Sequence, residues 1–106
     1  VTETDGVWKV TGLIDFADCM IGQPDYDFSA VAMFIVNGEP GLMRELFLSY
    51  GYDNEVINSH LVRKLMWLTL LHRFANFKTQ IRTDNWENRF TQLSDLEAFI
   101  WNIDYR

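Results

Sequence analysis

Four aspartates lie within one short segment, residues 12 to 28, and a cluster of carboxylates of this kind can serve metal binding. Asp15 directly follows an apolar run of strand type, and Asp18, Asp25 and Asp27 come soon after it. Hard divalent cations such as Mg²⁺ bind carboxylate oxygens together with phosphate and water. A carboxylate at a strand end, followed by a mobile loop, suits that purpose. On spacing alone, however, a solvated acid is the commoner arrangement.

A calcium-binding loop is excluded for the same segment. Asp25-x-Asp27-x-Ser29 begins with the required spacing, but Ala30 holds the glycine position and Val36 the position of the bidentate glutamate. Pro24 instead suits the first position of a helix. Asp25 and Asp27 then lie near the positive end of that predicted helix.

The histidines and the cysteine indicate no catalytic site. His60 and His72 lie twelve residues apart with no glutamate in zinc-binding register, which favours helix-surface or core positions over metal ligands. Cys19 has no neighbouring histidine or lysine to activate it, so a spectator thiol is favoured over a nucleophile. The 106 residues contain no phosphate-cradling glycine-rich loop.

The elements that would position Asp15 are a hairpin and a loop. Asp5-Gly6 is a hairpin-turn signal, and the pattern after it predicts a strand from Val7 to Phe16. The two-residue period places Ile14 and Phe16 on the buried face together with Trp8 and Val10, and Asp15 on the opposite face. Residues 17–23 are then predicted to be a loop.

The remainder of the chain predicts helices. A buried helix is expected over residues 28–36, ended by Asn37-Gly38, and a short amphipathic helix over residues 42–50, ended by Gly51. A long helix is expected from about Asn54, with a stripe of apolar residues at helical spacing that we interpret as core: Val56, Ile57, Leu61, Leu65, Leu68, Leu71 and Ala75. Ser94-Asp95-Leu96-Glu97 is a capping-box signature for a last helix through Trp101. The predicted fold class is therefore α+β, mostly α.

Composition and charge indicate a packed domain in a reducing compartment. The sequence is 48% hydrophobic and 15% aromatic, which argues against disorder, and its single cysteine allows no internal disulfide. Residues 1–55 carry a net charge of −8 and residues 56–106 a net charge of +2. The acidic half argues against a nucleic-acid partner and would favour metal ions or a cationic ligand. Neither a leader pattern nor an apolar run of bilayer length is apparent, so a cytoplasmic location without membrane contact is expected.

Two motifs resemble the aminoglycoside phosphotransferase family, whose fold is similar to that of protein kinases. The first is Gly12-Leu13-Ile14-Asp15-Phe16-Ala17-Asp18, and the second is Ile21-Gly22-Gln23-Pro24-Asp25-Tyr26-Asp27-Phe28. In that family an apolar strand ends in Ile-Asp-Phe or Ile-Asp-Trp, and a Gly-x-Pro-x-x-Asp stretch opens a buried helix. The resemblance covers residues 7 to about 36, and later helices are similar only in kind.

The resemblance implies a role for each aspartate. Asp15 would be the ligand of the Mg²⁺ that bridges the phosphates of ATP. Asp27 would be a structural residue that hydrogen-bonds the backbone of the catalytic loop. Asp18 and Asp25 are weaker candidates, for outer-shell metal contacts or for a cationic acceptor.

The resemblance also implies that residues 1–106 are the C-terminal part of a longer enzyme, with a hairpin and metal loop at 1–23 and a helical subdomain at 24–106. The family's His-x-Asp catalytic loop and its nucleotide-binding lobe do not appear in this sequence. We therefore expect no catalytic residue in this chain and no activity of the chain alone. The parent would phosphorylate a hydroxyl of a small molecule, either an aminoglycoside, which would link it to antibiotic resistance, or a related metabolite.

The alternative is a non-catalytic helical module that uses an aromatic-rich face for protein association. Aromatic residues crowd the second half of the sequence, among them Trp67, Phe74, Phe77, Trp86, Phe90, Phe99 and Trp101. Without its neighbouring lobe, the segment is also expected to expose apolar surface and to form a homodimer that covers it.

Overall fold

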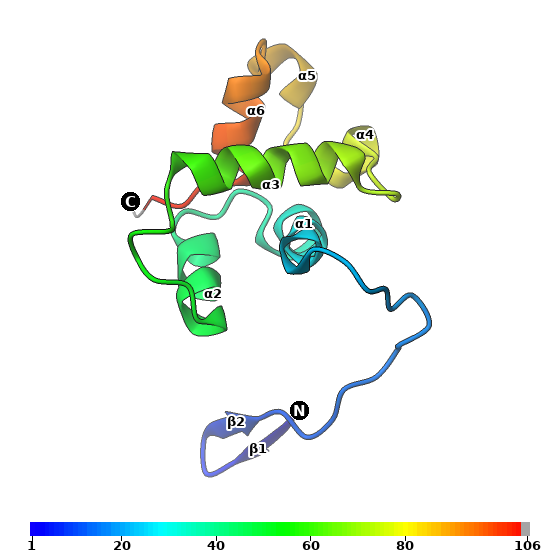
Figure 1. Ribbon diagram of the computed structural model, residues 1–106, viewed down its shortest axis with the longest axis vertical. Coiled ribbons are helices and arrows are strands. Elements are labelled where there is room, and N and C mark those ends of the chain that lie inside the picture. Colours follow the sequence, from blue (N-terminus) through cyan, green and yellow to red (C-terminus); the bar gives the residue numbers. More distant parts are fainter. Residues whose placement is uncertain (105–106) are drawn as a thin grey trace.

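The computed structural model describes residues 1–104 and is mostly helical (Figure 1). A two-stranded antiparallel hairpin comes first, followed by a long segment without regular structure and then by helices. The predicted α+β, mostly α class is therefore confirmed. Its elements are β1 (Thr2–Thr4), β2 (Val7–Lys9), η1 (Pro24–Tyr26), α1 (Asp27–Val31), η2 (Ala32–Val36), α2 (Leu42–Tyr50), α3 (Ser59–Leu71), α4 (Phe77–Gln80), α5 (Trp86–Arg89) and α6 (Leu93–Ile100).

The hairpin forms at the predicted turn. Asp5 and Gly6 have φ values of 53° and 75°, the left-handed pair that a tight two-residue hairpin turn requires. Glu3 lies opposite Trp8 in the register of the two strands. Figure 1 shows the hairpin standing apart from the helices. This separation raises the radius of gyration to 15.1 Å, where a compact chain of this length would have about 13 Å.

The predicted strand from Val7 to Phe16 is wrong beyond Lys9. Residues 10–23 have no regular secondary structure, and every residue from 1 to 24 is exposed. The reason is physical: β1 has only three residues, so the chain after Lys9 meets no second strand to complete its backbone hydrogen bonds. The face predicted to be buried is consequently open, with Ile14 at 86% and Phe16 at 59% exposure.

The predicted buried helix is present but is covered on one side only. It begins with η1 at Pro24, continues as α1, and ends in the wider π-helical turn η2. Asn37, with a φ of 49°, ends it as predicted. Phe28, Ala32, Met33 and Val36 are buried, whereas Ile35 is 73% exposed, so the helix is not buried all round.

The central helix of the fold is α3, which crosses between α1 and α6 (Figure 1). It begins later than the predicted Asn54, because the side chain of Asn58 accepts hydrogen bonds from the backbone N–H groups of His60 and Leu61 at 2.9 and 3.2 Å. It also ends at Leu71, before Ala75, the last residue of the predicted apolar stripe. Leu61 and Leu65 of the predicted stripe are buried, but Leu71 at its end is 76% exposed.

Two other predicted helices can be compared directly with the structure. α2 has the predicted bounds, and Gly51 ends it with a φ of 108°. α6 begins one residue before the predicted Ser94, and its capping box is formed by Gln92 and Asp95. Glu97 is therefore free to form an ion pair with Arg63 at 2.5 Å.

The aromatic residues of the second half do not form one exposed face. Trp101 is buried, and Phe77, Trp86, Phe90 and Phe99 pack partly buried against the core. Only Trp67 and Phe74 of the predicted set are more than half exposed, at 54% and 56%. Within residues 1–104, no helix has the length and apolar character needed to cross a membrane.

Candidate functional site

Asp15, the predicted metal ligand, lies in the exposed segment between the hairpin and η1. Its φ of 66° is in the left-handed region, which a residue other than glycine rarely adopts and which is often found at functional sites. Immediately after it, the backbone N–H of Cys19 donates to the carbonyl of Phe16 at 3.1 Å and closes a turn. The Asp15 carboxylate has no hydrogen bond or ion pair with any residue that the structure describes.

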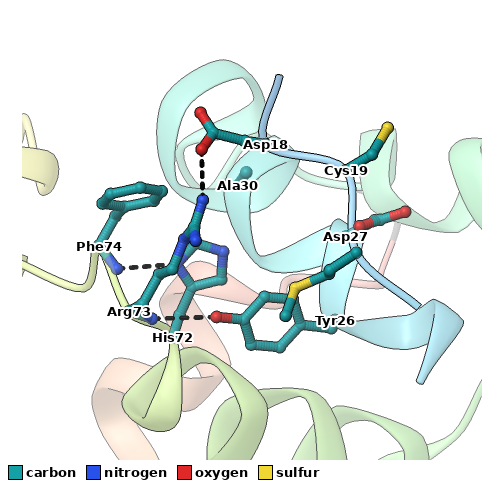
Figure 2. Close-up of a pocket in the computed structure, with 9 residues that line it drawn as sticks. Asp18, Cys19, Tyr26, Asp27, Ala30, His72, Arg73 and Phe74 are labelled. Carbon is teal, nitrogen blue, oxygen red and sulfur yellow. Dashed lines mark hydrogen bonds and ion pairs between the residues drawn. The ribbon is translucent and has the colours of Figure 1, made fainter. Parts of the chain in front are cut away.

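Asp18 lies within that turn and connects the segment to the helices. Its Oδ1 accepts from the guanidinium of Arg73 at 2.5 Å, across 55 positions of sequence. Both residues line a cavity of about 290 Å³, and Figure 2 shows their side chains joined by this contact. The two side chains are 77% and 48% exposed, respectively, so the pair is a surface contact.

An aromatic pair, Tyr26 and His72, also lines this cavity. The rings of Tyr26 and His72 are stacked, with centroids 4.4 Å apart and planes inclined by 14°. The Tyr26 hydroxyl accepts from the backbone N–H of Arg73 at 3.0 Å, and His72 Nδ1 accepts from the backbone N–H of Phe74 at 3.2 Å. The Arg73 guanidinium lies 4.5 Å from the centroid of the Phe74 ring. Figure 2 marks the two hydrogen bonds with dashed lines.

The cavity also perturbs its histidine. Burial lowers the pKa of His72, and the neighbouring Arg73 cation lowers it further, while the nearby charge of Asp27 opposes both effects. His72 therefore favours its neutral form, in which Nδ1 can accept a hydrogen bond. The sequence indicated a helix-surface or core position for His72, and the structure places it half-buried at the end of α3.

Asp25 has very different surroundings from those of the other three aspartates. It is 5% exposed, and its carboxylate accepts from Lys64 Nζ at 2.5 Å, from the Tyr52 hydroxyl and from Gln23 Nε2 at 3.3 Å. Burial opposes ionisation, but the Lys64 and Tyr52 contacts outweigh it and hold the pKa of Asp25 below its usual value. Burial and the same carboxylate raise the pKa of Tyr52 to about 12. These are the contacts of an ion pair that joins η1 to α3.

Asp27 is the first residue of α1, where a carboxylate stabilises the positive helix end, and it lines the cavity beside Tyr26. It is exposed, and its carboxylate has no hydrogen-bond partner among residues 1–104. The predicted partner, the backbone of a catalytic loop, is not among the described residues, so the structural role of Asp27 remains a prediction.

The structure thus brings Asp18 and Asp27 to one cavity and buries Asp25 against Lys64 and Tyr52, while Asp15 lies in the open loop before Asp18. Sequence reasoning missed Tyr26, Arg73 and Lys64. Tyr26 sits inside the recognised motif, but the two bases carry no local signal, because only the chain's path brings them to the aspartates. In the described part of the chain, no three histidine, cysteine, aspartate or glutamate side chains gather closely enough to hold a metal ion by themselves.

Comparison with known proteins gives one match. Residues 3–58 match the model of the phosphotransferase enzyme family, APH, and thus more than half of the 106 residues. Neither a curated protein nor a solved structure is significantly similar. The matched range contains most of the hairpin, the loop of Asp15 and Asp18, and the helical turns η1 and α1 that hold Asp25 and Asp27. The chain therefore belongs to the phosphotransferase enzyme family, as its two aspartate motifs predict.

Proposed function

We propose that residues 1–106 are the metal-binding, C-terminal part of an enzyme that transfers the γ-phosphoryl group of ATP to a hydroxyl of a small molecule. The family match across residues 3–58 is the observation that carries this proposal, because it encloses the Asp15 motif and the Asp27 motif together. The acceptor would be aminoglycoside-like or a related metabolite. A cytoplasmic location, where ATP is abundant, belongs to the same proposal.

Asp15 is the residue of this chain that we assign to Mg²⁺. Mg²⁺ in phosphoryl-transfer sites is usually held by one or two protein carboxylates, with phosphate oxygens and water completing its coordination. An exposed carboxylate without a protein partner fits that requirement, and the absence of a three-residue cluster within residues 1–104 does not conflict with it. When bound, the ion would neutralise charge on the phosphates.

The other three aspartates have supporting roles in this proposal. Asp25 connects η1 to α3 through its ion pair with Lys64. Asp27 would accept hydrogen bonds from the backbone of the parent enzyme's catalytic loop. Asp18 and Asp25 remain candidates for outer-shell or acceptor contacts, although each already has an ion pair here. The general base and the nucleotide-binding groups would come from other parts of the parent.

The test is Mg²⁺ dependence of phosphoryl transfer in the full-length protein. Asp15→Asn should raise the Mg²⁺ concentration for half-maximal rate at least tenfold, because a neutral amide is a poor ligand for a hard cation. Asp27→Asn should reduce folding yield or loop order more than Mg²⁺ dependence. Asp84→Asn, an exposed acid outside the matched range, is the control. Equal Mg²⁺ profiles for the Asp15 and Asp27 variants would contradict the separate roles.

The alternative of a protein-association module has less support. It depends on an exposed aromatic face, and most of those aromatic side chains pack against the core instead.

A further inference from the structure

The segment that carries Asp15 is the least supported part of the fold. Residues 10–23 form no helix or strand, and all of them are exposed. The hairpin before them stands apart from the helices (Figure 1) and therefore cannot hold them in place. A ligand for Mg²⁺ must nevertheless be held close to its productive position, since small displacements in phosphoryl-transfer sites cost rate.

One cation reaches this segment from the helical part of the described chain. Arg73 binds Asp18 at 2.5 Å, three positions after Asp15, at the turn that Phe16 and Cys19 close. The pair spans 55 positions of sequence. It therefore connects the loop to the end of α3 by a contact that local structure does not provide.

Arg73 itself is held on two sides. Its backbone N–H donates to the Tyr26 hydroxyl at 3.0 Å, and its guanidinium lies over the ring of Phe74. Tyr26 in turn stacks on His72. Residues 18 to 26 are thus attached at both ends to residues 72–74, and the cavity of about 290 Å³ lies between them (Figure 2).

From these contacts we propose that Arg73 is a positioning residue for Asp15. Through Asp18 it holds the metal loop against the end of α3 and limits the range of positions that the Asp15 carboxylate visits. The inference rests on the proposed function, because it concerns the loop of the proposed metal ligand. It assigns to Asp18 a role that requires no contact with metal or acceptor.

The expected size of the effect follows from exposure. Both side chains of the pair are about half exposed or more, at 48% and 77%, and exposed ion pairs shift an equilibrium by about two- to fivefold. The contact should also weaken with salt, because at 1 M ionic strength charges are screened over about 3 Å. The loop would therefore be held loosely enough to open.

Loop mobility can be measured through Cys19, the single cysteine of the 106 residues, which is exposed beside Asp18. A spin label is placed there in the full-length protein, with any cysteine outside residues 1–106 replaced by serine. Asp18→Asn and Arg73→Gln should each increase the mobile fraction about two- to fivefold. The two changes together should add little, and the exchange Asp18→Arg with Arg73→Asp should restore the immobile state.

The matched control is Arg63→Gln. Arg63 lies on α3, and its Nε binds Glu97 at 2.5 Å with a side chain 58% exposed, so it reproduces the loss of an arginine ion pair without touching the loop. It should leave the label unchanged. A second readout is the Mg²⁺ concentration for half-maximal phosphoryl transfer, which should rise about two- to fivefold in Arg73→Gln and return in the exchanged pair.

The outcomes separate this inference from the function on which it rests. Equal label mobility in the wild type and Arg73→Gln overturns the positioning role. So does an unchanged Mg²⁺ requirement in Arg73→Gln beside a raised one in Asp15→Asn. If Asp15→Asn keeps the wild-type Mg²⁺ requirement, the metal assignment itself fails, and the positioning role fails with it.

Discussion

Removing the cation from the buried ion pair, by the substitution Lys64→Met, should destabilise the protein strongly. Asp25 has a side chain 7% exposed, and Lys64 Nζ at 2.5 Å is its only cationic partner among the described residues. Breaking a buried pair from one side leaves an uncompensated charge, which costs about 3–5 kcal/mol when burial is complete. The Lys64 side chain is 48% exposed, and the hydrogen bonds from Tyr52 and Gln23 remain. We therefore expect a loss of about 2–3 kcal/mol at pH 7.

The pH dependence of that loss identifies its cause. In the wild type the pKa of Asp25 is depressed, so its contribution is present above the unfolded-state value of 3.8 and is lost as pH falls below that value. Without Lys64, burial should dominate and raise the pKa of Asp25 above 3.8. Protonation then relieves the buried charge, so the difference in stability between wild type and variant should shrink as pH falls from 7 to 4.

Urea unfolding and thermal unfolding, both followed by tryptophan fluorescence and repeated between pH 4 and 7, measure both effects. At about 4–8 °C per kcal/mol for a domain of this size, the melting temperature should fall by more than 8 °C at pH 7. Lys78→Met, which removes an exposed lysine of α4, is the control and should change stability by less than about 0.5 kcal/mol. A loss of the same small size in Lys64→Met, or one independent of pH, would show that solvent already screens the Asp25 charge.

Three further outcomes are expected. The purified 106-residue chain should phosphorylate no acceptor with ATP, and turnover that Asp15→Ala abolishes would disprove this. The free energy of unfolding should fall as pH drops through 6.5, because the pKa of His72 is depressed in the folded state and the unfolded state therefore takes up the proton first. His72→Gln should flatten this dependence on pH, and an unaltered dependence would exclude His72 as its source. The isolated chain should also form weak homodimers through exposed apolar side chains near its N-terminus, such as Trp8 at 67%, Val10 at 80% and Ile14 at 86% exposure. Sedimentation over a dilution series measures this association, and a monomer at every concentration would count against it.

Local signals predicted the turns and the helix ends well. The hairpin turn at Asp5-Gly6, the stop at Asn37 and the bounds of α2 all appear where the sequence places them. At each of these positions a residue that tolerates positive φ is required, and the requirement acts within a few residues. At α6 the predicted capping box was wrong by two residues, because Gln92 and Asp95 form the box in place of Ser94 and Glu97.

Predictions that depended on distant partners fared worse. The alternating pattern of residues 7–16 is typical of a half-buried strand, but a strand needs a neighbour, and β1 ends after three residues. The predicted apolar stripe of α3 runs to Leu71 and Ala75, but other elements cover only the earlier part of the helix, and both of these residues are exposed. In both cases the sequence pattern indicates which residues can be buried, whereas the arrangement of the elements decides which of them are buried.

For the site, the sequence by itself determined the family and the aspartates that define it, because both motifs are continuous in the chain. Only the tertiary structure distinguished those aspartates from one another. It buried Asp25 against Lys64, attached Asp18 to Arg73, and left the carboxylates of Asp15 and Asp27 without a hydrogen bond or ion pair among residues 1–104. The environment of a carboxylate depends on which cations reach it and how much water remains around it. Here those cations are Lys64 in the middle of α3 and Arg73 just beyond its C-terminal end. They lie dozens of residues away from the aspartates in sequence, and only folding brings them into contact.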